Sequence, residues 1–248
     1  MSARMKTFVC ILVLTFTPGL ALAAGGVHAP FSFKSDLGNE ASLQRGAAAY
    51  VNYCSGCHSM KYIRYNRLAQ DLGIPENLVM KHLAPAGAKP GDTIQTTLPS
   101  DSSAVWFGRS PPDLTLVARS RGIDWLYSYL LTFYVDPSKP SGVNNLMLPG
   151  LSMPHVLGGL QGQQKLVEPK EGEEGGHGKG PQFELVQKGS MTPEEYKQFV
   201  GDLTNFMIYA AEPAKMVRYG LGVKVILFLL LFTALAYLLK KEYWKDVH

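Results

Sequence analysis

The chain is poor in cysteine and has no concentrated run of positive charge. Only three of its 248 residues are cysteines, and Cys10 falls in an N-terminal segment with the features of a leader. The two others are too few for a disulfide framework. Between residues 24 and 217, seventeen Lys and Arg stand against eighteen Asp and Glu, a net charge of −1. This balance offers no basic patch for nucleic acid. The net charge of +4 therefore comes from the two ends of the chain.

The two remaining cysteines stand in the sequence Cys54-Ser55-Gly56-Cys57-His58. Two thiols three positions apart can each add across one vinyl group of a haem, and the adjoining histidine is then held at the iron. This is the attachment pattern of c-type haem. A redox disulfide would need a βαβ context, and a zinc site would need a second ligand pair; the sequence has neither. We predict one covalent haem c, bound through Cys54 and Cys57, with His58 as an axial ligand.

An apolar segment at the N-terminus has the form of a secretory signal. Arg4 and Lys6 precede an apolar run, and Ala21-Leu22-Ala23 forms a small-x-small cleavage site. We therefore expect a cleaved signal peptide over residues 1–23. A retained membrane anchor is the alternative.

A second apolar segment lies near the C-terminus. From Tyr219 to Leu239 the only charged residue is Lys224, and a helix of this length covers a hydrocarbon core of about 30 Å. Lysines and aromatic residues follow it, which places the C-terminus in the cytoplasm. We expect a periplasmic domain over 24–217, a transmembrane helix over 218–240 and a cytoplasmic tail over 241–248, in a bacterial inner membrane.

Hydrophobic spacing predicts two long helices in the domain between these segments. Residues 41–53 carry apolar residues three and four positions apart and would deliver the haem motif at their end. Thr192, Pro193 and Glu195 form the start signal of a helix over 191–212. Shorter helices are expected after Asp113 and Asp124, and each of these residues can cap its helix. Residues 84–104 and 135–155 look like loops, and 158–190 like an exposed hairpin or loop.

A haem iron held by His58 needs a ligand on its other face, and methionine there raises the reduction potential. The methionines after the leader are Met60, Met80, Met147, Met153, Met191, Met207 and Met216. Met147 and Met153 lie in a Pro/Gly-rich loop, which can present a ligand on irregular backbone. Pro154 stiffens that loop beside Met153. The sequence therefore favours Met153 as the second iron ligand. His155 is a rival that would give two histidine ligands and a lower potential.

Several further elements occur in a fixed order with the haem motif. These are Pro111-Pro112-Asp113-Leu114, Arg119-Ser120-Arg121, the loop Pro149-Gly150…Met153-Pro154 and a single C-terminal anchor. In this combination the chain resembles the cytochrome c1 family, the haem subunits of the ubiquinol–cytochrome c oxidoreductase (bc1) complex, in a proteobacterium. The resemblance covers essentially the whole chain. It implies a mainly α fold: a modified class I cytochrome c domain with long loops, plus one C-terminal transmembrane helix.

The resemblance also assigns roles to individual residues. It implies thioether bonds at Cys54 and Cys57, and His58 and Met153 as the two iron ligands. The other haem-binding candidates are Arg121 and Arg119 as propionate partners, Pro112 in the Pro-Pro-Asp-Leu element, and Trp125 beside the ring. His155 departs from the apolar residue or proline expected after Met153-Pro154.

The function implied by the resemblance is electron transfer from a Rieske iron–sulfur protein to a cytochrome c. The partners would be cytochrome b and the Rieske subunit, in a complex that is dimeric. With both axial positions filled by protein, this haem would perform no bond chemistry by itself. One alternative is a monohaem subunit of a nitric oxide reductase or haem–copper oxidase, although the C-terminal anchor argues against it. Another is a haem sensor or peroxidase-like protein with an open distal face.

Overall fold

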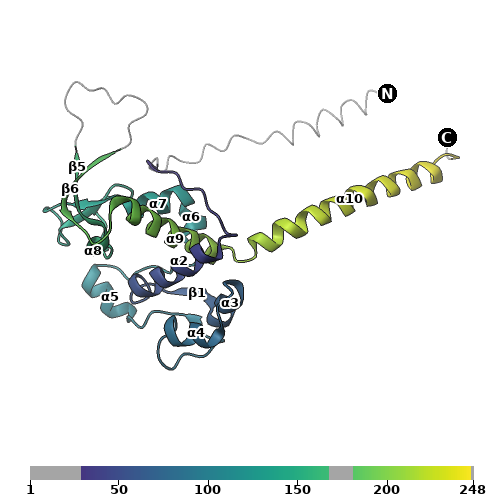
Figure 1. Ribbon diagram of the computed structural model, residues 1–248. Helices are drawn as coiled ribbons and strands as arrows, with labels where there is room; N and C mark the ends of the chain where they lie inside the picture. The colour runs from purple at the N-terminus through teal and green to yellow at the C-terminus, as the bar shows by residue number, and fades with distance from the viewer. Residues whose placement is uncertain (1–28, 168–180, 247–248) are drawn as a thin grey trace, which may run out of the picture.

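The structure is a computed structural model that describes residues 29–167 and 181–246. The predicted signal peptide, residues 168–180 and the last two residues lie outside the described residues. The described part is mainly helical, with three two-stranded sheets among the helices. The long helix α10 (Lys215–Tyr243) leaves the domain and extends away from it (Figure 1). The expected fold class, a mainly α domain with one C-terminal apolar helix, is confirmed.

Two crossed helices, α2 (Glu40–Tyr53) and α9 (Pro193–Ala211), form the centre of the domain (Figure 1). Asn39 caps α2 by accepting a hydrogen bond from the backbone N–H of Ser42. The expected capping box of Thr192 and Glu195 begins α9. The crossing is tight at Gly46, where a Cβ atom would lie 2.1 Å from the carbonyl oxygen of Asp202. Only glycine allows the two backbones to approach this closely.

A buried polar group fixes the same crossing. Asp202, which is 9% exposed, accepts hydrogen bonds from the Ser42 hydroxyl at 2.6 Å and from Nε of Arg45 at 2.6 Å. Asn205, one turn along α9, exchanges hydrogen bonds with the backbone of Asp36 in the N-terminal arm. A buried carboxylate is tolerated because charged and polar donors surround it. The first half of α2 is therefore held firmly to α9.

One half of the domain follows the haem motif. Strand β1 (Met60–Arg64) pairs antiparallel with β2 (Thr93–Ile94), and helices α3 (Tyr65–Asp71), α4 (Glu76–His82) and α5 (Ser100–Phe107) accompany them. These elements lie on one side of α2 (Figure 1). The expectation of a continuous loop over 84–104 is wrong, because β2 and the first turn of α5 fall within it.

The other half packs against α9. It contains α6 (Val117–Arg121), α7 (Ile123–Leu131), β3 (Phe133–Val135), β4 (Val143–Asn145) and α8 (Gly158–Gln161). Strand β3 pairs antiparallel with β4. The expected hairpin follows as β5 (Gly162–Val167) and β6 (Gln182–Lys188), also antiparallel.

The expected helix caps at Asp113 and Asp124 are wrong. Asp113 accepts hydrogen bonds from the backbone N–H groups of Lys61 and Thr115, so it ties the loop to β1 instead of starting a helix. Asp124 lies inside the first turn of α7 and accepts from the backbone N–H of Phe33 at 2.7 Å. Each carboxylate accepts from a backbone N–H that is distant in sequence, Lys61 for Asp113 and Phe33 for Asp124.

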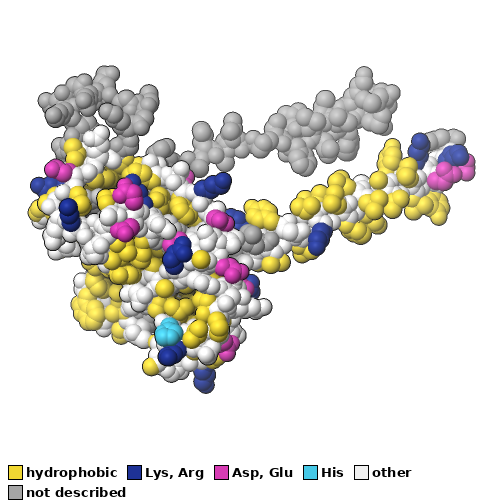
Figure 2. Space-filling model, in the orientation of Figure 1, with side chains coloured by type: hydrophobic (Ala, Val, Ile, Leu, Met, Phe, Trp, Pro, Cys, Tyr) yellow, Lys and Arg dark blue, Asp and Glu magenta, His cyan; other side chains and the backbone are white. Residues whose placement is uncertain are grey.

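Helix α10 contains an apolar stretch from Val217 to Tyr243, with a mean hydropathy of 2.4 in its richest window and no burial against the rest of the protein. Its 27 residues correspond to about 40 Å of helix, more than the hydrocarbon core of a bilayer requires. Hydrophobic side chains dominate its surface along its length (Figure 2). An apolar helix exposed on all sides fits a single membrane anchor.

Candidate haem-binding site

A cavity of about 350 Å³ lies where the haem motif meets the loops on either side of α6 and α7. Its walls come from four parts of the chain: the end of α2, residues 107–130, residues 148–156 and the middle of α9. The lining is mostly apolar, with aromatic, proline and leucine side chains. Of the predicted site residues, those that line it are Cys54, Cys57, His58, Pro112, Arg121, Trp125 and Met153.

The haem motif begins where α2 ends. The N–H of Cys54 still bonds to the carbonyl of Tyr50, and the N–H groups of Cys57 and His58 then turn back to the carbonyl of Cys54 at 3.0 and 2.9 Å. These turns bring both sulfur atoms and the imidazole to one cavity. The Tyr50 hydroxyl donates to the carbonyl of His58 at 2.6 Å and fixes the end of the turn.

The His58 ring is oriented by a backbone group. Its Nδ1 lies 2.7 Å from the carbonyl oxygen of Pro112. A carbonyl can only accept, so Nδ1 carries the hydrogen and Nε2 keeps a free lone pair. Burial lowers the pKa of His58, which favours this neutral form. The imidazole is therefore prepared to bind a metal through Nε2.

The two cysteines are free thiols in the described structure. Burial, together with the smaller effect of the nearby Cys57, raises the pKa of Cys54 to about 12. Reactive pairs of redox enzymes instead have lowered thiol pKa values. The environment therefore suits permanent attachment of a cofactor better than repeated thiol chemistry.

The loop that carries Met153 is held by two buried asparagines. The side-chain oxygen of Asn145 accepts from the N–H of Met147 at 2.8 Å, and its amide donates to the carbonyl of Tyr129 at 2.8 Å. The oxygen of Asn144 accepts from the N–H of Gly150 at 2.9 Å. The loop is thus fixed to α7 without regular secondary structure of its own.

The structure separates the candidates for the second iron ligand. Met153 lines the cavity, and its Sδ accepts a hydrogen bond from the Tyr129 hydroxyl at 3.2 Å. Met147 is buried but is not part of the lining. His155 stacks on Phe133 with ring centres 4.5 Å apart and is also absent from the lining. Its Nε2 is buried with no hydrogen-bond partner in the described part of the chain, and burial lowers its pKa to about 4. Met207 of α9 is buried in the core and also lines the cavity.

Among the described residues, Arg109 and Arg121 are the only charged ones in the lining of this cavity. The guanidinium of Arg121 lies 5.2 Å from the ring centre of Trp125, a cation–π contact. Arg119 is exposed and is not part of the lining. The second arginine in the lining is Arg109, which the sequence did not indicate as a site residue. Its only signal in the sequence is its position two residues before Pro111-Pro112.

These groups fit a c-type haem. Two thiols, an imidazole with a free Nε2 and a thioether supply its attachment sites and two soft or borderline iron ligands. The two guanidinium groups in the lining could pair with its propionates. The apolar walls suit a flat hydrophobic ring.

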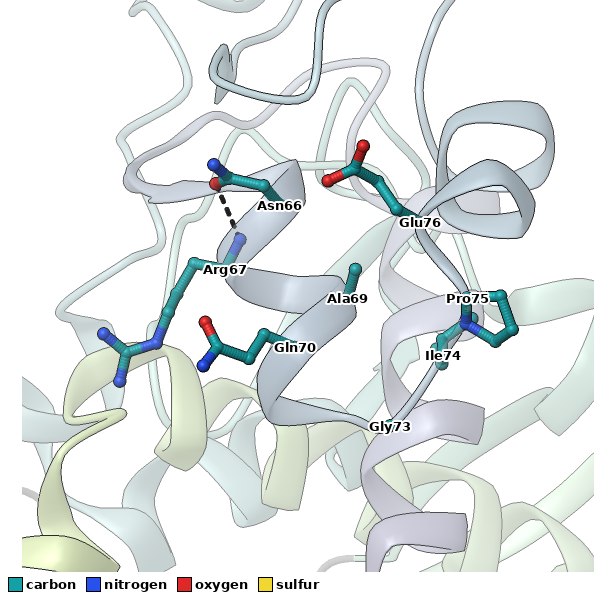
Figure 3. Close-up of a pocket in the computed structure, with 8 residues that line it drawn as sticks. All are labelled: Asn66, Arg67, Ala69, Gln70, Gly73, Ile74, Pro75 and Glu76. Carbon is teal, nitrogen blue, oxygen red and sulfur yellow. Dashed lines mark hydrogen bonds between the residues drawn. The ribbon is translucent and has the colours of Figure 1, made fainter.

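A second recess, between α3 and α4, is open and is lined by both polar and apolar residues (Figure 3). It is lined by Asn66, Arg67, Ala69, Gln70, Gly73, Ile74, Pro75 and Glu76. Arg67 pairs there with Asp71, which also accepts from the Tyr209 hydroxyl at 2.9 Å. The recess shares no residue with the haem cavity, and its charges join α3 to α9.

The fold, the cavity and the exposed apolar helix together define a membrane-anchored c-type cytochrome. The chain belongs to the cytochrome c1 family, whose model matches residues 31–174 and 180–247. Membership of this family means covalently bound haem c and a role in electron transport.

Known relatives match the chain over nearly its full length. It is 49% identical to a cytochrome c1 of Allochromatium vinosum, over 98% of this chain and all of that one. It is 43% identical to a protein of Nitrosomonas europaea named ammonia monooxygenase gamma subunit, over 99% of this chain and all of that one. It is 26% identical to a cytochrome c1 of Cereibacter sphaeroides, over 98% of this chain and 96% of that one.

Proposed function

We propose that the chain is the haem subunit of a quinol-oxidising bc1 complex and carries single electrons from a Rieske iron–sulfur protein to a cytochrome c. The observation that carries this proposal is a cavity in which His58 offers a free Nε2 while Met153 is held in the same lining. Two protein ligands would leave no position at the iron for substrate. Such a site suits electron transfer and not bond chemistry.

A single haem c bound here supplies a one-electron Fe(III)/Fe(II) couple. The chain's residues set the conditions for that couple. Cys54 and Cys57 would hold the ring by thioether bonds, and His58 and Met153 would bind the iron. The soft thioether of Met153 favours the ferrous state and so a high potential. The apolar walls would exclude water, and Arg109 and Arg121 would neutralise the propionates.

The proposed topology follows from the two apolar segments. The domain lies on the periplasmic side of a bacterial inner membrane, α10 crosses the membrane once, and the lysines after it remain in the cytoplasm. Residues 218–240 lie within α10. Cytochrome b and the Rieske subunit are the proposed partners in the membrane, in a dimeric complex.

The name of the Nitrosomonas relative gives a second candidate, a subunit of an ammonia-oxidising enzyme. The same haem site would serve either assembly, because each requires only an electron carrier. A sensor or peroxidase-like function is less well supported, since Met153 lines the cavity where such a protein needs an open face.

The test is to purify the tagged protein from its own membranes in a mild detergent and record a reduced-minus-oxidised spectrum. Haem b in excess over haem c, together with a Rieske iron–sulfur signal, is the expected result. Co-purification with copper and no haem b would contradict the bc1 assignment and favour the alternative assembly.

A further inference from the structure

Tyr129 is the residue that directly contacts the proposed methionine ligand. Its hydroxyl lies 3.2 Å from Sδ of Met153 and has no other hydrogen-bond partner among the described residues. A thioether has two lone pairs and no hydrogen, so the phenol must be the donor. One lone pair can then accept this hydrogen while the other remains for the iron.

The position of Tyr129 is fixed from three sides. Its ring stacks on Trp125, with centres 5.1 Å apart and planes 11° from parallel. Phe133 meets the ring edge-on at 5.2 Å. Its backbone carbonyl accepts from Asn145, the same side chain that holds the start of the Met153 loop. The hydroxyl and the sulfur are therefore carried by two segments that are locked to each other.

We propose that Tyr129 is a positioning residue that tunes the haem by donating a hydrogen bond to the sulfur of Met153. The proposal rests on the proposed ligation by Met153. The O–H group draws electron density from the sulfur, which makes it a poorer donor to ferric iron. Ferrous haem is then stabilised relative to ferric haem, so the reduction potential rises. Groups behind a metal ligand commonly tune a metal in this way.

The test is Tyr129→Phe in the full-length protein, studied in its native membrane complex. Phenylalanine keeps the ring packing on Trp125 and Phe133 and removes only the hydroxyl. We expect the ratio of reduced to oxidised haem c at a fixed ambient potential to fall by about twofold to tenfold, the range of one neutral hydrogen bond. The ferric absorption band of methionine-ligated haem should persist but shift, because the sulfur stays bound and becomes a stronger donor.

Tyr127→Phe is the matched control. Tyr127 lies on the same helix but stacks on Phe33 at 4.9 Å and does not line the cavity. The Tyr127→Phe substitution should leave both the ratio of reduced to oxidised haem and the ferric absorption band unchanged. An equal effect of the two substitutions would overturn the proposal, because it would reflect only the loss of a hydroxyl from α7.

Two other outcomes also overturn it, in distinguishable ways. If Tyr129→Phe abolishes the methionine band and lets CO bind, Tyr129 holds the loop closed and does not tune a bound sulfur. If neither Tyr129→Phe nor Met153→Leu changes the ratio or the band, the proposed ligation by Met153 is itself wrong. If Met153→Leu changes them and Tyr129→Phe does not, the ligation stands and the role of Tyr129 falls.

Discussion

The two sides of the haem cavity are built in different ways. The attachment side is a continuous run, Cys54 to His58, shaped by backbone hydrogen bonds at the end of one helix. The methionine side is a loop held by the side chains of Asn144 and Asn145 and by the hydroxyl of Tyr129. In the proposed haem protein, covalent bonds would secure the first side, whereas hydrogen bonds and packing secure the second. The methionine side is therefore the side that substitutions can adjust without losing the cofactor.

The largest expected effect comes from breaking the attachment side. His58→Leu removes the imidazole whose Nε2 faces the cavity, and we expect the yield of correctly ligated haem protein to fall by about tenfold or more. Haem-stained gels and the visible spectrum measure this loss. His82→Leu on exposed α4 is the control and should leave the spectrum unchanged. A normal spectrum from His58→Leu would refute its assignment as a ligand.

The next effect separates the two cavity methionines. Met153→Leu should lower the haem potential by on the order of 0.1 V, because axial ligands set potentials over a range of about 0.8 V. It should also open the iron to CO. Met207→Leu, on α9, conserves volume in the same lining and should change the potential little. Redox titration and CO difference spectra decide between them, and the reverse pattern would make Met207 the ligand.

A smaller effect tests how the methionine side is held. Asn145→Ala removes the hydrogen-bond partner of the Tyr129 carbonyl and of the Met147 N–H. Each buried group left unpaired costs about 1–3 kcal/mol of folding free energy. We expect a partial loss of methionine ligation, seen as a CO-binding fraction, with haem attachment intact. Asn77→Ala on the exposed face of α4 is the control. Normal CO exclusion in Asn145→Ala would mean that the loop holds itself.

The smallest expected effect concerns the charges around the cavity. Arg109→Gln removes one of the two guanidinium groups in the lining, and an unpaired propionate then favours ferric haem, so the potential should fall. By the same argument, Arg119→Gln should have almost no effect, because Arg119 points away from the lining. Equal shifts for the two variants in a redox titration would show that only the overall charge matters.

Local signals predicted the attachment side and the two crossed helices. The haem motif is contiguous, and the capping box at Thr192 acts within one turn, so neither depends on the rest of the fold. The paired arginines show where such signals fail. Arg119 and Arg121 are two positions apart on a helix, so they point about 200° apart and cannot both face one cavity.

The methionine side was predictable only in part. Met153 could be favoured because proline and glycine surround it, but the residues that hold it could not be found. Asn145 lies in a segment that looks like an ordinary loop, and Tyr129 looks like one more apolar residue of a helix. Their roles depend on contacts between α7 and the loop that exist only after folding. Asp113 and Asp124 were misjudged for the same reason.

The contact between His58 and Pro112 has a consequence for genetic screens. The acceptor that orients the axial imidazole is a main-chain oxygen, and every amino acid carries one. No exchange of the side chain at position 112 deletes it. In a scan of substitutions, position 112 would therefore show only the effects of changed backbone conformation. The hydrogen bond that fixes the tautomer of His58 would go undetected. The most important neighbour of this histidine is one that mutation cannot remove but can only displace.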